Sequence, residues 1–176
     1  MTTNHRIYLA GPDLFFDNSE ERYASLKEYC RLAGFEGVSP MDDFDPSGIE
    51  PDSMAQAIYQ HNRNMLESCD AVLANLSAFR GTEPDSGTVF EAAYAFSKGI
   101  PVAAYTVDGL STSDRHLLIR KAFVDHGGSL RDSEDGGSIE NFGLPSNLML
   151  ALSFPVMQTP QQALERLVAA GLRKLV

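Results

Sequence analysis

The stretch from Gly81 to Glu91 carries two carboxylates, Asp85 and Glu91, with five residues between them. Two carboxylates across a cleft are the usual apparatus for cleaving a glycosidic bond, one acting as nucleophile and the other as acid. An N-glycosidic bond in a nucleoside passes through the same oxocarbenium-like state, and a deoxyribose forms this state more readily because it has no 2-hydroxyl. A buried anion beside C1′ would stabilise that positive charge. The pair therefore suggests cleavage of a glycosidic bond, which need not be that of a polysaccharide.

Glu91 is expected in the first turn of a helix that begins near Gly87 or Thr88. The N-terminus of a helix favours an ionised carboxylate by roughly 0.3 to 1 kcal/mol, so Glu91 would be held as an anion. The same spacing also fits an ordinary first-turn glutamate, with Asp85 as a turn residue. Asp85 is expected in a loop that follows a strand, and Glu91 just after that loop. This position favours the functional interpretation.

The rest of the chain alternates between short apolar runs and segments with helical periodicity. Strands are expected at the apolar runs that end at proline, glycine or polar residues, which are residues 6–10, 35–39, 71–75 and 100–105. Helices are expected at residues 19–34, 54–65, 88–98 and 160–175. This alternation predicts an α/β domain with an open parallel sheet that helices cover on both faces. Residues 1–176 are expected to form a single domain.

The segment after Thr106 follows this pattern less clearly. A helix is expected from Asp114 to Val124. Paired glycines with polar neighbours predict an exposed hairpin or lid near residues 130–139. Residues 108–143 are thus the part of the domain expected to form a lid or hairpin.

Ligands of an open α/β sheet bind outside the carboxyl ends of the strands, where the strand order reverses. The loops expected there are residues 11–16, 42–45 and 79–88. None of them has the glycine pattern of a phosphate-binding loop, and their aspartates would repel a phosphate. Dinucleotide and nucleoside triphosphate binding are therefore disfavoured.

The composition excludes several other classes of protein. The chain has 24 acidic and 14 basic side chains among 176 residues, a formal net charge of −10 at pH 7, which disfavours nucleic acid as a partner. The longest apolar run, residues 100–107, is far shorter than a membrane helix requires, so no membrane partner is expected. The first residues lack the features of a signal peptide, which predicts a cytoplasmic protein. Cys30 and Cys69 stand alone and the histidines have no metal-binding spacing, so neither a metal nor a cofactor is expected.

Five stretches of the sequence belong together as one pattern. They are Tyr-Leu-Ala-Gly-Pro at 8–12, Asp-Ala-Val-Leu-Ala-Asn at 70–75, the stretch 81–91, Lys-Gly-Ile-Pro-Val at 98–102 and Gly-Leu-Pro-Ser-Asn-Leu-Met-Leu at 143–150. This pattern resembles the nucleoside 2-deoxyribosyltransferase family from Arg6 to about Leu152. The resemblance implies a flavodoxin-like, Rossmann-like fold. It also implies a transferase of nucleoside salvage that exchanges the base of a 2′-deoxyribonucleoside with a free purine or pyrimidine base.

The resemblance implies roles for three catalytic residues. Glu91 matches the nucleophile that attacks C1′ and forms a covalent deoxyribosyl ester, which a second base resolves by a ping-pong mechanism with overall retention. Asp85 matches the residue that contacts the nucleobase and handles its proton, and Tyr8 matches the tyrosine that positions the nucleophile. In general, a tyrosine on a central strand is more often part of the core.

Seven further residues are candidates for substrate binding. Asn147 and Met149 match residues that in this family reach into a neighbour's pocket, which implies a homo-oligomer, dimer-based or hexameric, with shared active sites. Asn62 stands where many relatives carry an aspartate that contacts the base, and its amide can hydrogen bond but cannot take a proton. The other four candidates follow the first two strands and are Gly11, Phe15, Asp43 and Phe44. Phe15 also fits a plain hydrophobic anchor, and Asn147 also fits a helix cap.

Two other functions stay open at this point. One is a hydrolase with the same nucleophile, in which water resolves the ester, as in the related deoxynucleotide N-hydrolases that bind a 5′-phosphate. The loop Pro-Asp-Leu-Phe-Phe at 12–16 is acidic and bulky rather than rich in glycine and serine, which favours nucleosides over nucleotides. The other is a non-catalytic flavodoxin-like module that senses nucleosides. A receiver-type signalling domain is disfavoured, because Asn75 and not an aspartate ends the third strand.

Overall fold

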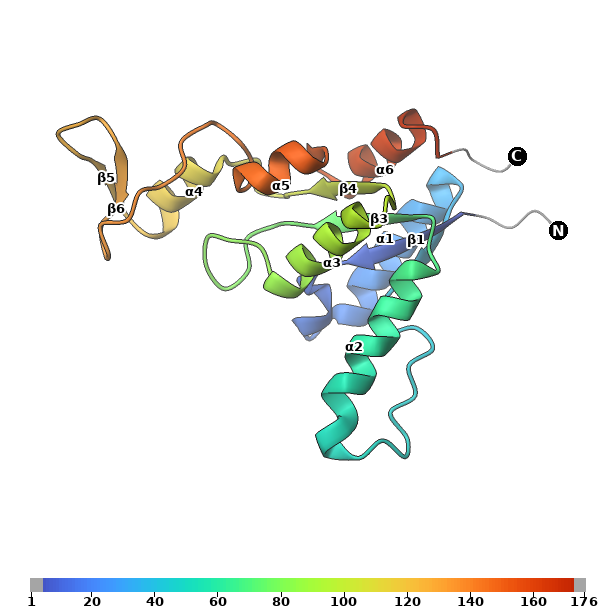
Figure 1. The fold of residues 1–176 in the computed structure, drawn as a ribbon. Coiled ribbons are helices and arrows are strands. Elements are labelled where there is room, and N and C mark those ends of the chain that lie inside the picture. Colours follow the sequence, from blue (N-terminus) through green and yellow to red (C-terminus); the bar gives the residue numbers. More distant parts are fainter. Residues whose placement is uncertain (1–4, 173–176) are drawn as a thin grey trace.

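The computed structural model describes residues 5–172 and contains a parallel sheet of five strands (Figure 1). The strand order is β2-β1-β3-β4-β7, and every neighbouring pair is parallel. The strands are β1 (Arg6–Ala10), β2 (Glu36–Val38), β3 (Ala71–Asn75), β4 (Val102–Tyr105) and β7 (Val156–Met157). The expected flavodoxin-like fold in a single domain is confirmed.

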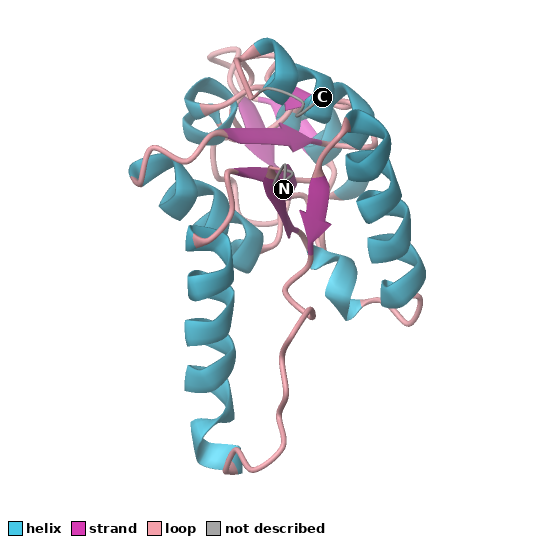
Figure 2. Ribbon diagram, turned by 90° about the vertical axis from the view of Figure 1, so that its right-hand side faces the viewer, coloured by secondary structure: helices cyan, strands magenta, loops and turns pink. Residues whose placement is uncertain are grey.

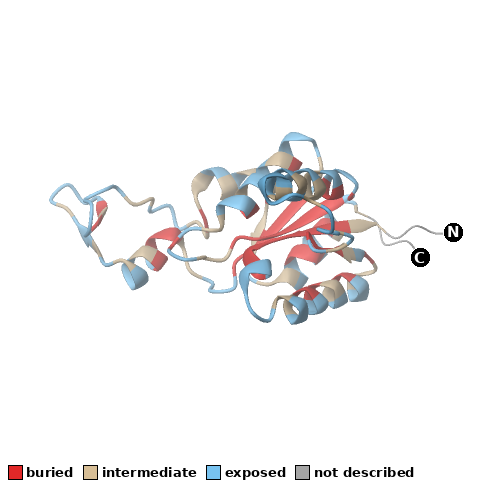
Figure 3. Cartoon of the chain, turned by 90° about the horizontal axis from the view of Figure 1, so that it is seen from below, coloured by how far each residue is buried: buried red, intermediate tan, exposed pale blue. Residues whose placement is uncertain are grey.

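Helices cover both faces of the sheet. One face packs against α1 (Ser19–Ala33) and α6 (Pro160–Ala169), and the other packs against α2 (Pro51–Glu67), α3 (Ser86–Ser97) and α5 (Leu148–Ser153). Figure 3 shows the buried strands as a red layer between the helices. Figure 2 shows that α2 extends well beyond the sheet, so much of its N-terminal half is exposed to solvent.

The sequence of the strands explains why both of their faces are buried. All residues of β3 and all but the first of β1 are buried, as is typical of parallel strands between two layers of helices. Side chains alternate along each strand, so Tyr8 and Val72 belong to the core beneath α2 and α3. Leu9 and Leu73 belong to the core beneath α1 and α6.

α1 agrees closely with the sequence prediction. Glu20 and Glu21 occupy its first turn, and Gly34 ends it in a left-handed conformation with a φ of 85°. Asn18 is the N-cap residue, but its side chain makes no capping hydrogen bond and accepts one from Arg22 instead.

The segment after β4 differs from the prediction. α4 covers Thr112–Ile119 and does not continue to Val124, because Lys121 adopts a left-handed φ of 58° that ends a helix. The following residues form an antiparallel hairpin of β5 (Ala122–Val124) and β6 (Leu130–Asp132), which projects away from the sheet in Figure 1. The hairpin expected near residues 130–139 therefore begins earlier in the chain.

The C-terminal part adds an edge strand that the sequence did not indicate. β7 pairs with β4 through only two residue pairs, which is too short a run to show a strand periodicity. α6 ends at Ala169, before the expected limit, and residues 173–175 of that expected helix lie outside the described residues. Within residues 5–172, none of the helices combines the length and the apolar character needed to cross a membrane.

Candidate active site

Tyr8 and Glu91 form a hydrogen-bonded pair between the sheet and α3. Tyr8 lies in the central part of the sheet and is fully buried. Its hydroxyl donates a hydrogen bond of 2.6 Å to Oε1 of Glu91. Alternation along β1 directs Tyr8 to the face that α3 covers, so the fold itself brings together two of the predicted catalytic residues.

The electrostatic environment of Glu91 differs from the prediction. α3 begins at Ser86 and has no acidic residue in its first turn, so the helix N-terminus does not hold Glu91 as an anion. Burial instead raises the pKa of the Glu91 carboxyl to about 7. The hydrogen bond from Tyr8 opposes this rise, and the negative charge of Asp85 adds to it. A substantial fraction of Glu91 is therefore protonated at neutral pH.

The Tyr8 phenol remains a hydrogen-bond donor under the same conditions. Burial and the adjacent Glu91 carboxylate raise the Tyr8 pKa far above its usual range. The phenol therefore keeps its proton at neutral pH and donates a hydrogen bond to the carboxylate.

Asp85 is the N-cap residue of α3. Its Oδ2 accepts hydrogen bonds from the backbone N–H of Thr88 at 2.8 Å and from the Thr88 hydroxyl at 3.0 Å. This is the turn role that the sequence left open for Asp85. Oδ1 makes no hydrogen bond to another side chain or backbone group in residues 5–172, and it is the oxygen left for a ligand.

A cavity of about 170 Å³ between α2 and α3 has Glu91 in its wall. Asn62 of α2 lines the same cavity, so the structure places this base-binding candidate near the carboxyl. Sequence reasoning missed the rest of the lining, which is Tyr59, Arg63, Leu66, Gly87, Phe90 and Tyr94. The sequence did contain a signal for them. Within each helix the lining residues are three or four positions apart, which places them on one face of that helix.

The far end of this cavity is fixed by a polar and aromatic cluster. The Arg63 guanidinium donates hydrogen bonds to the hydroxyl of Tyr94 at 2.7 Å and to Glu67 at 3.2 Å. The ring of Phe90 stacks on Tyr94 with the centroids 5.9 Å apart. The hydrogen bond between Arg63 and Tyr94 joins α2 to α3 at this part of the cavity wall.

Phe44 and Asp43 lie in the loop after β2, beside α2. The Phe44 ring packs against His61 at a centroid distance of 5.1 Å, and Nε2 of His61 lies 3.0 Å from the carbonyl oxygen of Asp42. His61 directly precedes Asn62, so these contacts tether the loop near the cavity. Asp43 is exposed and has a left-handed φ of 57°.

Gly11 ends β1 in a crowded position. A Cβ atom on Gly11 would lie 2.6 Å from Oδ2 of Asp13 and 3.0 Å from Cβ of Asn75, so only glycine fits without displacing them. Asp13 is buried, accepts a hydrogen bond of 2.9 Å from Asn75, and forms an ion pair of 3.0 Å with Arg22. Asp13, one of the aspartates expected to repel a phosphate, thus carries a buried charge that is paired with an arginine.

Phe15 is not a buried anchor. It lies in the 3₁₀ helix η1 (Pro12–Phe15), is 51% exposed, and stacks on Phe79 with the ring centroids 5.4 Å apart. Phe79 belongs to the loop after β3, so the two rings connect the loops that follow two adjacent strands.

Asn147 and Met149 do not line the Glu91 cavity within one chain. The Asn147 side chain caps α5 by accepting from the backbone N–H of Met149, and its amide donates to Glu140 at 2.8 Å. Asn147 also lines a separate polar cavity of about 250 Å³ next to His116. The Met149 side chain is 68% exposed on α5.

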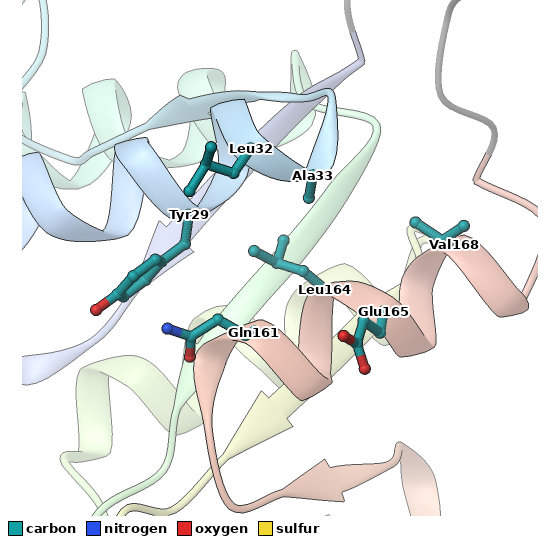
Figure 4. Close-up of a pocket in the computed structure, with 7 residues that line it drawn as sticks. All are labelled: Tyr29, Leu32, Ala33, Gln161, Leu164, Glu165 and Val168. Carbon is teal, nitrogen blue, oxygen red and sulfur yellow. The ribbon is translucent and has the colours of Figure 1, made fainter.

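The cavity in Figure 4 lies between α1 and α6, on the other face of the sheet from Glu91. Aliphatic side chains such as Leu32, Leu164 and Val168 form much of its wall, and Glu165 contributes a single carboxylate. It therefore lacks the paired carboxylates needed for glycosidic chemistry. Among the residues that the structure describes, no cluster of three or more His, Cys, Asp or Glu side chains is arranged to hold a metal ion.

The fold and the site define a flavodoxin-like domain with a partly buried carboxyl that is hydrogen bonded by a tyrosine of the central sheet. Comparison with known proteins identifies the family. Residues 7–149 match the family described as Nucleoside 2-deoxyribosyltransferase, and the chain belongs to this family.

Individual relatives agree with this assignment. A solved 2-desoxiribosyltransferase from Leishmania mexicana is 30% identical, with a TM-score of 0.73 over 95% of this chain and 99% of that one. A conserved protein from Enterococcus faecalis V583 is 22% identical, with a TM-score of 0.62 over 96% of this chain and 99% of that one, and shares the fold. An uncharacterized protein of Schizosaccharomyces pombe is 28% identical over 93% of this chain and 88% of its own length.

Proposed function

We propose that this protein exchanges the nucleobase of 2′-deoxyribonucleosides through a covalent deoxyribosyl ester on Glu91, as a reaction of nucleoside salvage. The observation that carries the proposal is the partly buried Glu91 carboxyl, which accepts a hydrogen bond from Tyr8 and lines a cavity between two helices. Membership of the nucleoside 2-deoxyribosyltransferase family and the similarity to the Leishmania mexicana enzyme support it.

The exchange consists of two displacements at C1′. An oxygen of ionised Glu91 attacks C1′, the C1′–N bond breaks with its electron pair on the base, and the base takes up a proton and leaves. A nitrogen of the second base then attacks C1′ and breaks the ester, whose electron pair returns to Glu91, while that base loses a proton. Each displacement inverts C1′, so the product retains the original configuration.

The surrounding residues have separate tasks in this scheme. Tyr8 donates to Oε1 of Glu91 and leaves Oε2 to attack the sugar. Asp85, with Oδ2 fixed by Thr88, uses Oδ1 to give the proton to the leaving base and to accept it from the incoming one. Asn62 recognises the base from the opposite wall of the cavity.

The binding site for the sugar is completed by a second copy of the chain. Asn147 and Met149 lie away from the Glu91 cavity of their own chain, as residues that serve a neighbour would. Asn147→Ala and Glu91→Ala should each lack exchange activity, and mixed oligomers of the two should recover part of it. Verified mixed oligomers without recovery would exclude shared sites.

Incubation with deoxyinosine, with and without free adenine, tests the proposal directly. Deoxyadenosine that forms only when adenine is present identifies a transferase. Free deoxyribose and hypoxanthine formed without adenine would identify a hydrolase with the same nucleophile. Glu91→Gln should form neither product, and binding of deoxyinosine without turnover by the wild type would point to a sensor.

A further inference from the structure

The side-chain amide of Asn147 is held at both of its polar atoms. Its Oδ1 accepts a hydrogen bond of 3.0 Å from the backbone N–H of Met149, and its Nδ2 donates one of 2.8 Å to Oε1 of Glu140. The reverse orientation would turn the NH2 group toward an N–H donor and the amide oxygen toward a carboxylate, so both contacts select the same orientation. Within residues 5–172, the second N–H of Nδ2 makes no hydrogen bond, and it is the donor that Asn147 can offer to a ligand.

Glu140 uses both oxygens of its carboxylate on this segment. While Oε1 accepts from Asn147, Oε2 accepts a hydrogen bond of 2.9 Å from the backbone N–H of Leu148, the first residue of α5. The first N–H groups of a helix have no partner within the helix, and a charged acceptor makes stronger hydrogen bonds than a neutral one. One carboxylate thus fixes the start of α5 together with the amide that precedes it.

The chain around Glu140 is itself anchored to the segment that projects from the sheet. The N–H of Ile139 donates to the carbonyl oxygen of Leu130 in β6 at 3.0 Å. Between Glu140 and Asn147, the carbonyl oxygen of Leu144 accepts a hydrogen bond of 2.8 Å from the N–H of Thr112, the first residue of α4. The connection from the hairpin to α5 is therefore held against both the hairpin and α4 (Figure 1).

A buried arginine of α4 holds the backbone just before Asn147. Arg115 is 2% exposed and donates to Asp108 through two hydrogen bonds of 2.7 Å and 2.9 Å. Its Nη2 also lies 3.3 Å from the carbonyl oxygen of Pro145, to which it donates. Arg115 thus anchors the backbone of this connection, whereas Glu140 orients the Asn147 side chain. A substitution of Glu140 therefore leaves the backbone anchors in place.

We propose that Glu140 is a positioning residue for the exchange reaction, which orients the Asn147 amide so that its free N–H meets the deoxyribose bound by a second copy of the chain. This inference rests on the proposed function. The segment of residues 108–143 then has a task other than closing over its own Glu91 cavity, because it supports a residue that serves the neighbour. Glu140 touches no substrate in this scheme and acts only through Asn147.

A positioning role predicts an effect on substrate binding rather than on the chemistry at C1′. An amide that is already oriented loses less conformational freedom when the sugar binds than an amide that is free to rotate. Loss of Glu140 should therefore raise KM more than it lowers kcat.

Glu140→Gln tests this prediction in the exchange between deoxyinosine and adenine. Glutamine has nearly the shape of glutamate, but its NH2 group cannot accept a hydrogen bond, so it cannot serve Asn147 and Leu148 together. The variant should raise KM for deoxyinosine by about threefold to tenfold and leave kcat within about twofold. Glu134→Gln, which removes an exposed charge of the same segment, is the control and should change neither. An unchanged KM in Glu140→Gln would overturn the inference.

Mixed oligomers separate the positioning of Asn147 from a general structural role. Oligomers of an Asn147→Ala chain and a Glu91→Ala chain contain sites with an intact Glu91 from the first chain and an intact Asn147 from the second. Glu140→Gln added to the Glu91→Ala chain should raise KM for deoxyinosine as it does in the single variant. The same substitution added to the Asn147→Ala chain should leave KM unchanged. An equal change in both arrangements, which a structural role predicts, would overturn the inference.

The failure of this inference can be distinguished from that of the proposed function. If the wild type exchanges bases but the mixed oligomers recover no activity, Asn147 does not serve a neighbour and the inference fails, while base exchange stands. If the wild type does not turn over deoxyinosine, the proposed function fails. Calorimetry with deoxyinosine then decides, because weaker binding by Glu140→Gln than by Glu134→Gln supports the positioning role, and equal binding refutes it.

Discussion

Replacing Glu91 by glutamine should change how the stability of the protein depends on pH. The pKa of the Glu91 carboxyl is about 7 in the folded protein, against an ordinary value of 4.5. As the pH rises from 4.5 to 7, the unfolded chain loses this proton while the folded chain keeps it. The contribution of Glu91 to the free energy of unfolding is therefore complete below pH 4.5 and is lost as the pH rises to about 7.

The size of this effect follows from the pKa difference. About 2.5 pKa units correspond to about 3 kcal/mol. Because glutamine does not ionise, the unfolding free energy of Glu91→Gln relative to the wild type should rise by about 3 kcal/mol between pH 4.5 and pH 8. The same variant should lose exchange activity, so the variant is expected to be more stable and inactive at pH 8.

Urea unfolding followed by circular dichroism at several pH values measures this difference. Equal protein concentrations are needed, because the stability of an oligomer depends on concentration. Glu165→Gln, on the opposite face of the sheet, controls for the loss of one negative charge. A difference between Glu91→Gln and the wild type that stays constant from pH 4.5 to pH 8 would refute a raised pKa and the buried environment that causes it.

Substitutions at three further residues test the other parts of the site. Tyr8→Phe removes the hydrogen bond that lowers the Glu91 pKa, so the exchange rate at pH 7 should fall by about tenfold to a hundredfold and its pH–rate profile should shift to higher pH. An unshifted profile would contradict this coupling. Asp85→Asn should keep the cap of α3 and lose exchange activity. Asp85→Ala should also lose exchange activity and, in urea unfolding, about 1 kcal/mol of stability. Equal stability of the two variants would rule out the capping role. Gly11→Ala should lower the unfolding free energy by about 1–3 kcal/mol, because its Cβ would lie 2.6 Å from a buried carboxylate oxygen, and an unchanged midpoint would show that this contact relaxes freely.

The sequence predicted those elements whose signals are local. β1 and β3 have the expected bounds because each is an apolar run with an abrupt end at glycine, proline or polar residues. α1 ends as expected because Gly34 provides the left-handed residue of a helix terminus. The hairpin β5–β6 was placed too late in the chain, because the left-handed conformation of Lys121 has no signal in a residue type that normally continues a helix.

The candidate site shows the same contrast between features with a local sequence signal and features that only the folded chain reveals. The motif predicted Tyr8, Asp85 and Glu91 as catalytic residues, and the structure brings Tyr8 and Glu91 together. The motif did not reveal the one-turn difference that moves Glu91 away from the helix N-terminus. The pairing of Asp13 with Arg22 was also hidden, because only the folded chain brings the ends of β1 and β3 together around the carboxylate. The number of charged residues in a loop is therefore a poor guide to the electrostatic potential at a ligand-binding site.

The position of Glu91 in the second turn has a chemical advantage over the expected first-turn position. A helix N-terminus would stabilise the carboxylate and thus favour the free enzyme over an ester. Burial does the opposite, because the environment that raises the pKa of Glu91 disfavours its charge and so favours any step that removes it, ester formation included. In the proposed exchange, the hydrogen bond from Tyr8 would limit this bias by stabilising the carboxylate that the second half-reaction regenerates. The proposed exchange is reversible and needs both half-reactions to proceed, and the opposing effects of desolvation and of the Tyr8 hydrogen bond on Glu91 would serve both.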